Sequence, residues 1–313
     1  MSSLKNKIDW AVLVAVTNAN PGGDPLNGNR PRADYDGYGE MSDVCIKRKL
    51  RNRMQDLELS VFVQSNDRND DGCRSLRERA DACVKDAKGD EIKFVKDACE
   101  KWIDVRAFGQ VFAFKGDEEA KNDTEDNTGN EEADAAKSAK RKKKAKKSKG
   151  ISIGIRGPVS IHQAFTVSPI DIEDMQISKS VNNETEDDGK KGSDTLGMKH
   201  FVRFGLYLLK GSINVQLAEK TGFSEKDADI LKECLRTLFV NDSSSARPEG
   251  SMEVLKVYWW KHDCKDGKYS TAKVHRSLHV TPKENIDVPS SADDYVITLD
   301  DLPGLKPEII DGI

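Results

Sequence analysis

The sequence predicts an α+β fold, because segments of strand character alternate with segments that have the apolar spacing of helices. Residues Ile8 to Val16 form a nearly continuous, valine-rich apolar run, which is typical of a buried central strand. When insertions are left aside, the segments follow the order strand, helix, strand, strand, helix, strand. This order predicts the split βαβ, or ferredoxin-like, arrangement that RNA-recognition domains also use.

The first predicted helix follows a loop rich in glycine, asparagine and proline, in which glycine lets the backbone approach a ligand closely. Ser42 or Asp43 can cap the N-terminus of this helix. Its apolar side chains recur at spacings of four, four and three residues, so they give one face of the helix to the core. These side chains are Ile46, Leu50, Met54 and Leu57.

Basic residues dominate the rest of the same helix. Between Val44 and Arg53 none of the residues is acidic and five are basic, namely Lys47, Arg48, Lys49, Arg51 and Arg53. A solvated helix face normally mixes both signs, so we expect positive charge here without local neutralisation. This pattern favours a nucleic-acid backbone as the ligand, and a solvated face is the alternative.

A set of residues in and near this region is therefore predicted to contact RNA. The candidates are Asn20, Arg30 and Arg32 in the loop, Lys47, Arg48 and Arg51 on the helix, and Arg247 in a second loop that precedes a strand. For Arg247 the competing interpretation is a solvent-exposed loop arginine.

The middle of the chain alternates between ordered and charged segments. Apolar spacing from about Cys73 to Phe114 predicts a mainly helical region. Lys115 to Gly150 has an acidic half followed by a basic tract, Arg141 to Lys149, and too few apolar residues to form a core. We expect this segment to be a disordered surface insertion. Its basic tract could contact nucleic acid, and a self-compensating loop is equally compatible with the composition.

Strand character returns from Ile151 to Val167 and again from Phe201 to Ile213. The excursion between these two segments has a polar, glycine-containing middle, Asn182 to Ser193. An excursion of this length between two strands predicts a protruding hairpin.

The last third of the chain begins with a second well-marked helix. Ser224 is its predicted N-cap, and Asp227 occupies the capping-box position, where glutamate is more usual. The apolar residues at core spacing are Leu231, Cys234, Leu235 and Leu238. The segments that follow with strand character are Met252 to Trp260, Tyr269 to Thr281 and Tyr295 to Leu299.

Composition argues against several classes of protein. The chain carries 54 acidic and 50 basic side chains, but these charges are segregated along the sequence, so the net charge of −4 hides local patches. The longest apolar run, Trp10 to Val16, is far shorter than the roughly 20 residues of a membrane helix, and nothing resembles a signal peptide, so we expect a cytoplasmic protein.

No metal, cofactor or catalytic residue is predicted. The six cysteines include no C-x-x-C pair, which argues against a zinc site and a disulfide framework. His275 and His279 have the i, i+4 spacing that suits a metal only on a helix, whereas their surroundings alternate like a strand.

The chain lacks the aromatic segment with which RNA-recognition domains stack bases. The nearest segment, HFVRFGLY, has aromatic residues but not the pattern. We therefore expect loops and helices to hold an RNA backbone, rather than a sheet face to stack bases.

Several sequence blocks, in order along nearly the whole chain, closely resemble one protein family. They are NPGGDPLNGNRPRADYDGYGEMSDVCIKRKLRNR, DVRAFGQVF, IRGPVSIHQAF, the pair MQISKS and DTLGMKH, LYLLKGSIN, and SSSARPEGSMEVLKVYWWKH. The family is the repeated backbone subunit that coats CRISPR RNA in type I CRISPR surveillance complexes (Cascade), specifically the type I-C form. Lys115 to Gly150 departs from the resemblance, because it is longer and more charged than expected.

The resemblance implies a hand-shaped protein that polymerises along a CRISPR RNA and leaves guide bases free to pair with target DNA. It implies an RRM-like palm (about 1–57, 151–167 and 201–299), a helical finger region (about 58–150, including the insertion 115–150) and a hairpin thumb (about 168–200). Each thumb would cross the guide of the adjoining subunit and displace a nucleotide. Met175 and Met198 at the thumb base could act as a wedge beside that base, and hairpin core is the alternative role.

The implied partners are CRISPR RNA, the target DNA strand in the heteroduplex and further copies of the same chain. The resemblance also implies the other Cascade subunits, which are a large subunit, a small subunit and a subunit that processes the guide and binds its 5′ handle. The assembled complex would recruit a helicase-nuclease. No membrane partner is expected.

Two other functions fit parts of the sequence. Related backbone subunits of type III complexes cut RNA with an aspartate between the first strand and first helix, and this chain has Asp24, Asp34 and Asp36 there. A metal-dependent RNA endonuclease using Asp24 is therefore one alternative, although an aspartate after Gly-Gly often only bonds its own turn. A stand-alone RNA-binding module is the other, and it would explain the basic helix but not the long excursion before Phe201.

Overall fold

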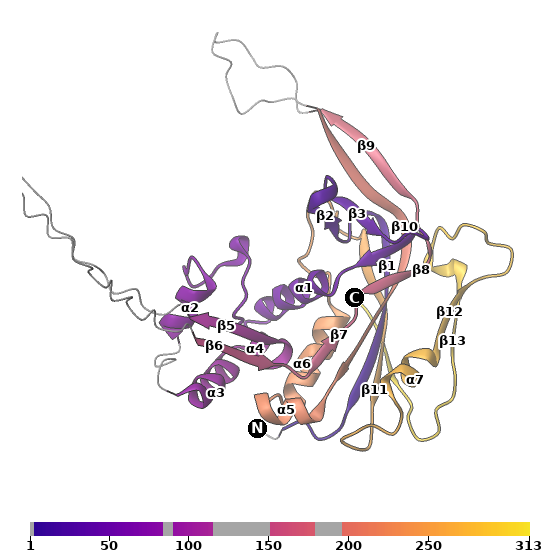
Figure 1. Ribbon diagram of the computed structural model, residues 1–313. Helices are drawn as coiled ribbons and strands as arrows, with labels where there is room; N and C mark the ends of the chain where they lie inside the picture. Colours follow the sequence, from indigo (N-terminus) through magenta and orange to yellow (C-terminus); the bar gives the residue numbers. More distant parts are fainter. Residues whose placement is uncertain (1–2, 84–89, 115–150, 179–195) are drawn as a thin grey trace, which may run out of the picture.

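A large antiparallel sheet with helices packed against it confirms the predicted α+β class (Figure 1). The structure is a computed structural model that describes residues 3–83, 90–114, 151–178 and 196–313. The central strand, β1 (Ile8–Ala19), pairs antiparallel with β10 (Leu196–Ile213) on one side and β11 (Met252–Lys261) on the other. Val12 lies opposite Leu209 and Val257 in the two ladders.

The sheet extends outward from these three strands. Beyond β11 lies β14 (Glu308–Asp311). Beyond β10 the order is β8 (Ala164–Pro169), β4 (Tyr38–Met41), β3 (Arg30–Ala33) and β2 (Gly23–Asp24). Two further strands, β7 (Val159–Ile161) and β9 (Ile172–Ser178), also pair with β10.

Both faces of β1 are buried, as its continuous apolar sequence predicts. Trp10, Val12 and Val14 pack in one core, which α1 (Asp43–Asp56), α5 (Val215–Thr221) and α6 (Glu225–Arg236) cover. Ala11 and Leu13 pack in a second core, which receives α7 (Thr271–Arg276), β12 (Leu278–Pro282) and β13 (Tyr295–Leu299). The sheet is therefore the middle layer of three.

The two predicted palm helices begin and pack as expected. Ser42 caps α1 by accepting from the Cys45 N–H, and the side chains of the predicted stripe are buried or packed against the first core. Ser224 and Asp227 form the predicted capping box of α6. Short 3₁₀ helices occur at η1 (Pro25–Asn27), η2 (Asn66–Arg68) and η3 (Ala292–Asp294).

Two strand predictions were wrong in extent. Tyr269–Thr281 is not one strand, because Ser270 caps a helical turn, α7, and only β12 continues as a strand. The segment 151–167 contains three strands, and the first, β6 (Ile151–Arg156), turns away from the sheet to pair with β5 (Gly109–Phe114). The separation occurs at Gly157, where a Cβ atom would lie 2.3 Å from the Ala107 carbonyl oxygen.

The β5–β6 ribbon forms a lateral unit with α2 (Leu76–Cys83), α3 (Glu91–Lys101) and α4 (Ile103–Phe108). Its core includes Phe62, Phe94, Trp102 and Phe112, whose rings contact one another. In Figure 1 this unit lies on the far side of α1 from the C-terminal β12–β13 ribbon. The region is helical as predicted, but the ribbon was not predicted.

The two arms of the predicted hairpin are present. β9 pairs with the first part of β10 from Ile172↔Val202 to Ser178↔Leu196, and this pair projects beyond the sheet (Figure 1). Its predicted polar middle, Asn182 to Ser193, lies outside the described residues, as does the charged segment Lys115 to Gly150.

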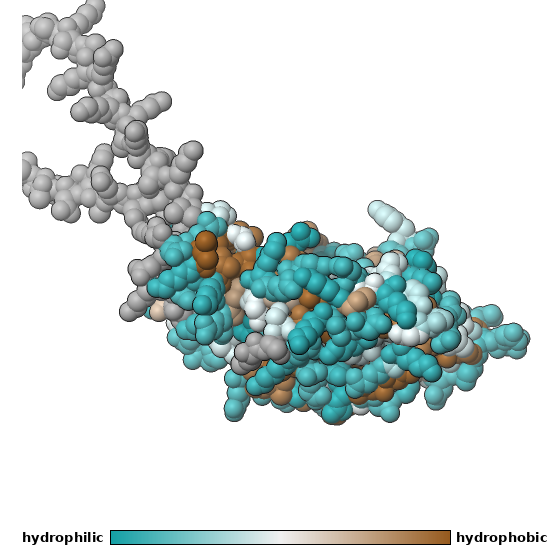
Figure 2. Space-filling view, turned by 90° about the horizontal axis from the view of Figure 1, so that it is seen from below, coloured by the Kyte–Doolittle hydropathy of each residue, from teal (hydrophilic) through white to brown (hydrophobic). Residues whose placement is uncertain are grey.

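The surface is mainly hydrophilic on the face shown in Figure 2, with apolar residues in separate patches. Among the residues that the structure describes, none of the helices has the length and apolar character needed to cross a membrane.

A buried polar network ties β1 to the C-terminal elements. The Asp9 carboxylate accepts hydrogen bonds from His262 Nε2 (2.9 Å) and Thr271 Oγ1 (2.8 Å), and His262 Nδ1 accepts one from the Lys268 N–H (2.9 Å). Burial would raise the pKa of Asp9, but these hydrogen bonds and the Lys7 charge outweigh it and lower the pKa.

Asp9→Asn should lower the free energy of unfolding by about 1–3 kcal/mol, because it leaves buried donors with a poorer acceptor. The control Asp300→Asn removes the exposed partner of His279 and should cost less than about 1 kcal/mol in the same urea titrations. The Asp9 contribution in the wild type is fully present above its unfolded pKa of about 3.9 and is lost as pH falls toward the lower folded pKa. Equal costs for the two variants at neutral pH would contradict this role.

Candidate nucleic-acid interface

The loop after β1 is held in shape by its own side chains. Asn20 is almost fully buried, its Nδ2 donates to the Asn29 carbonyl (2.7 Å), and its Oδ1 accepts from the Gly22 N–H (3.2 Å). Its backbone N–H donates to the Ala246 carbonyl (2.9 Å), which places the loop that carries Arg247 next to this one. Asn20 is therefore a buried side chain whose hydrogen bonds fix the shape of this loop.

Two loop arginines lie on the same side of β3. Arg30 and Arg32 are two residues apart in this strand, so their side chains share a face. Arg32 pairs with Asp24 (3.3 Å), and Arg30 pairs with Asp174 on β9. About a third of each arginine side chain is exposed (33% and 38%), so both remain accessible to a ligand.

The expectation of an unneutralised helix was wrong, because acidic residues from distant parts of the chain pair with it. Lys49 pairs with Asp242 and Arg51 with Asp104 (2.8 Å). The spacing of residues within the helix could not predict these partners, because Asp242 lies 193 positions from Lys49 and Asp104 lies 53 positions from Arg51.

The remaining helix cations also have partners, but these differ in burial. Arg48 donates to the Val63 carbonyl (2.8 Å), and Arg53 donates to Thr237 Oγ1 (2.7 Å). Among the described residues Lys47 pairs only with Asp43, one turn earlier, and this pair is partly exposed. Of the helix cations, Lys47 is therefore the one whose carboxylate partner could most easily be replaced by another anion.

Asp104 is the most heavily used carboxylate at this site. It is 1% exposed, and it accepts hydrogen bonds from the Phe62 N–H (2.7 Å), the Val63 N–H (3.1 Å) and Arg51 Nε. The guanidinium of Arg51 also lies over the Phe108 ring at 5.2 Å. Arg51 thus connects α1 to α4 of the lateral unit through its contacts with Asp104 and Phe108.

Arg247 lies on the other side of α1. It donates to Asp242 (3.1 Å), the carboxylate that also holds Lys49. Burial raises the pKa of the nearby Cys45 thiol, and the charges of Lys49, Arg247 and Arg32 oppose that shift. The structure therefore brings Arg32 and Arg247 to the same end of α1, whereas Arg48 and Arg51 face the lateral unit.

The two hairpin methionines point in different directions. Met175 lies opposite Lys199, and Met198 lies opposite Gln176. Cross-strand partners share a face and successive residues alternate, so Met175 and Met198 lie on opposite faces of the ribbon. Both are about half exposed (49% and 54%), which excludes a common buried core.

Met198 shares its face with Asp174 and His200, which hydrogen-bond each other at 2.7 Å. Asp174 also holds Arg30, so this face of the hairpin is the one joined to the arginine-bearing loop. Hydrogen bonds from Arg30 and His200 lower the pKa of Asp174.

The aspartates considered for catalysis are engaged in turns. Asp24 accepts from the Leu26 N–H (3.2 Å) as the cap of η1 and pairs with Arg32, and Asp34 accepts from the N–H groups of Asp36 and Tyr38. Within the described ranges, no group of three or more His, Cys, Asp or Glu residues has the arrangement of a metal site.

The chain matches the family model described as CRISPR-associated protein Cas7 over residues 6–300. A relative from Haloferax volcanii described as "CRISPR-associated protein Cas7" is 23% identical, over 98% of this chain and 85% of the relative. A solved chain of a "CRISPR RNA-guided surveillance complex, pre-nicking" is 12% identical with a TM-score of 0.43, covering 86% of this chain and 81% of that one. A second, from a "CRISPR RNA-guided surveillance complex", is 15% identical with a TM-score of 0.39, covering 81% and 68%.

Arg51→Ala should lower the free energy of unfolding by roughly 3 kcal/mol, because it leaves the Asp104 carboxylate buried without its cation. Lys47→Ala on the same helix is the matched control and should cost less than about 1 kcal/mol, because its ion pair is partly exposed. Both values can be measured by chemical denaturation without RNA. A small cost for Arg51→Ala would mean that Arg51 is free for a ligand after all.

Proposed function

The chain belongs to the CRISPR-associated Cas7 family, and from that premise we propose that it binds CRISPR RNA as the repeated backbone subunit of a surveillance complex. The family match over residues 6–300 carries this proposal. The sequence blocks that resemble type I-C subunits support assignment to that form, with the guide presented to a target DNA strand. The partners would be further copies of the chain, the large, small and guide-processing subunits, and a recruited helicase-nuclease.

Three parts of the fold support a palm, finger and thumb organisation. In the main sheet β11, β1, β10 and the pair β7 and β8 are neighbours, and α1 and α6 cover one face, which is the arrangement expected of a split βαβ palm. The lateral unit of α2–α4 would be the fingers, and it includes β6 because that strand pairs with β5. The β9–β10 hairpin would be the thumb.

The guide backbone is proposed to lie across the exposed end of α1 and β3. Arg30, Arg32 and Lys47 would contact phosphates directly, because each is partly exposed and paired with a partly exposed carboxylate that a phosphate can replace. Arg247 is also partly exposed and would add a phosphate contact while its carboxylate, Asp242, stays paired with Lys49. Arg48, Arg51 and Asn20 would position these groups through their internal hydrogen bonds. Contacts of this kind carry no base information and suit a guide of variable sequence.

The displaced guide nucleotide is proposed to meet Met198 rather than Met175. Met198 lies on the hairpin face that Asp174 joins to Arg30, so it is on the side of the proposed RNA path. The protein would act by binding, with Asp24 as a turn residue rather than a catalyst.

The triple variant Arg30→Ala, Arg32→Ala, Lys47→Ala should weaken guide RNA binding equally for unrelated spacers. The slope of log affinity against log salt should fall in magnitude by about 0.7 for each phosphate that the variant no longer binds. A control with three exposed, ion-paired lysines replaced, Lys256, Lys261 and Lys265, removes the same charge elsewhere and should leave the slope unchanged. If filter binding gives the triple variant the affinity and salt slope of the wild type, this surface is not part of the RNA site.

Met198→Ala should disturb the periodic nuclease footprint of guide RNA in the assembled complex, because the side chain beside each displaced nucleotide is removed. Met175→Ala removes an equally exposed methionine from the opposite face and should leave the footprint intact. Equal effects of the two variants, or an effect of Met175→Ala alone, would show that the wedge is assigned to the wrong face.

A further inference from the structure

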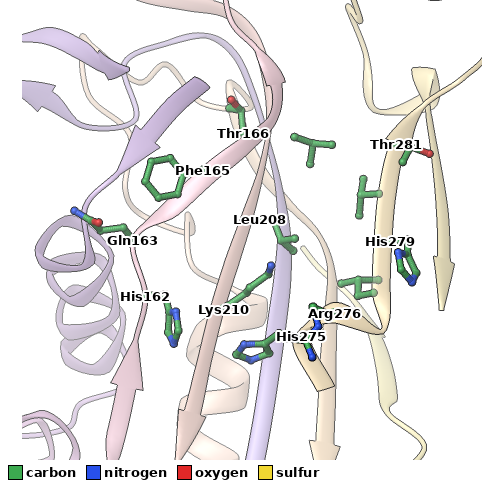
Figure 3. A pocket seen from close by; sticks show the side chains of 13 residues that line it. His162, Gln163, Phe165, Thr166, Leu208, Lys210, His275, Arg276, His279 and Thr281 are labelled. Carbon is green, nitrogen blue, oxygen red and sulfur yellow. The ribbon is translucent and has the colours of Figure 1, made fainter. Parts of the chain in front are cut away.

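A cavity of about 670 Å³ lies between the sheet and the C-terminal elements, and none of the residues proposed to contact the guide lines it. Its walls come from β8, β10, α7 and β12, as Figure 3 shows. Leu278 in these walls belongs to the second core, and Leu208 and Val280 pack against it, whereas α1 packs against the first core on the other face of the sheet. Its volume is typical of a ligand site.

The described residues that line the cavity are cationic, polar or apolar and include no carboxylate, although Gln163 of the lining donates to Glu40 (2.9 Å), which lies opposite Phe165 on β4. Lys210 on β10 and Arg276 on α7 take part in none of the ion pairs found among the described residues. Burial lowers the pKa of Lys210, and no acidic group opposes that shift. A half-buried ammonium without a counter-charge is costly, and a bound anion would offset that cost.

The histidines that line the cavity form part of its wall, but they are not permanently charged groups. His275 Nε2 donates to the Gly211 carbonyl (3.1 Å), and its ring meets that of His162 edge to face at 5.7 Å (Figure 3). Burial lowers the pKa of His275, so this ring is neutral near pH 7. His279 is paired with Asp300, which leaves Lys210 and Arg276 as the cations available to a ligand.

The cavity also presents an aromatic face. Phe165 lies opposite Leu208 across β8 and β10 and is 40% exposed, although it belongs to a strand of the main sheet. An exposed ring near two unpaired cations is the combination with which proteins hold single-stranded nucleic acid, because bases stack on rings while cations meet phosphates. An acidic peptide would use the cations but would gain little from the ring.

We propose that this cavity binds a short segment of single-stranded nucleic acid other than the guide, with a base against Phe165 and the adjoining phosphate between Lys210 and Arg276. None of the residues proposed to contact guide phosphates lines the cavity, so the two sites have no residue in common and can be filled together. The assignment to a strand other than the guide rests on the proposed function, whereas binding itself needs only the groups that line the cavity.

The test uses the full chain loaded with guide RNA and a fluorescent DNA oligonucleotide that is not complementary to the guide. Lys210→Gln with Arg276→Gln should weaken oligonucleotide binding roughly tenfold and reduce the salt slope by about 1.4, or 0.7 for each cation. Phe165→Leu should weaken binding without changing the slope, because it removes stacking and no charge.

The matched control is Lys273→Gln with Lys265→Gln, which removes the same charge, once from α7 itself, from side chains outside the cavity. Because Arg276 is exposed, the single variant Arg276→Gln should fold even if the double variant is unstable. It should show half of the slope change. Oligonucleotide binding by the cavity variants equal to that of the control would overturn the proposal. So would displacement of the oligonucleotide by polyglutamate with no effect of Phe165→Leu.

Failure of the guide to bind would concern the proposed function alone. In that case the oligonucleotide titration is repeated without guide on a chain that carries Arg30→Ala, Arg32→Ala and Lys47→Ala, so that the surface proposed for the guide contributes less to the measured binding. Loss of binding on adding the cavity variants supports the proposal, and unchanged binding overturns it.

Discussion

The buried carboxylate of Asp104 is the constraint on which the basic helix depends. This residue is only 1% exposed. Its carboxylate accepts hydrogen bonds from three donors in two other segments, the N–H groups of Phe62 and Val63 and the side chain of Arg51. An ionised group at this depth is tolerable only when its lone pairs are satisfied, so α1, the segment after it and α4 must hold a fixed geometry. One cation of the helix is used for this purpose and cannot also be a free ligand.

The same logic divides the other cations near α1 into two groups. Lys49 is buried against Asp242, and Arg48 and Arg53 donate to groups of the fold itself. Arg30, Arg32 and Lys47 have partners that are at least partly exposed, and such pairs contribute little to stability. Replacing an exposed carboxylate by a phosphate therefore costs little. Because Arg30 pairs with Asp174 on β9, such an exchange would also change the contacts at the base of the hairpin.

Local signals in the sequence predicted the parts of the fold that local physics determines. The apolar stripe of α1 and the capping box of Ser224 depend on neighbours a few residues away, and the continuous apolar sequence of β1 was enough to predict its burial. The ion pairs of Lys49 and Arg51 were missed because their partners are distant in the chain, and charge patterning within a helix contains no information about them. The opposite faces of Met175 and Met198 depend on the register of β9 with β10, which spacing alone does not give.

The two faces of the sheet differ in how completely they are covered, and β10 shows why. Along the second face its side chains read Leu206, Leu208 and Lys210, so the apolar pattern ends where α7 approaches the strand. An apolar residue at the last position would extend the core and close the gap. Lysine instead keeps a charged, partly desolvated group there, with no ion-pair partner in the described part of the chain, which works against folding. Because local departures of this kind gather where a protein binds ligands, the cavity is better explained by binding than by packing.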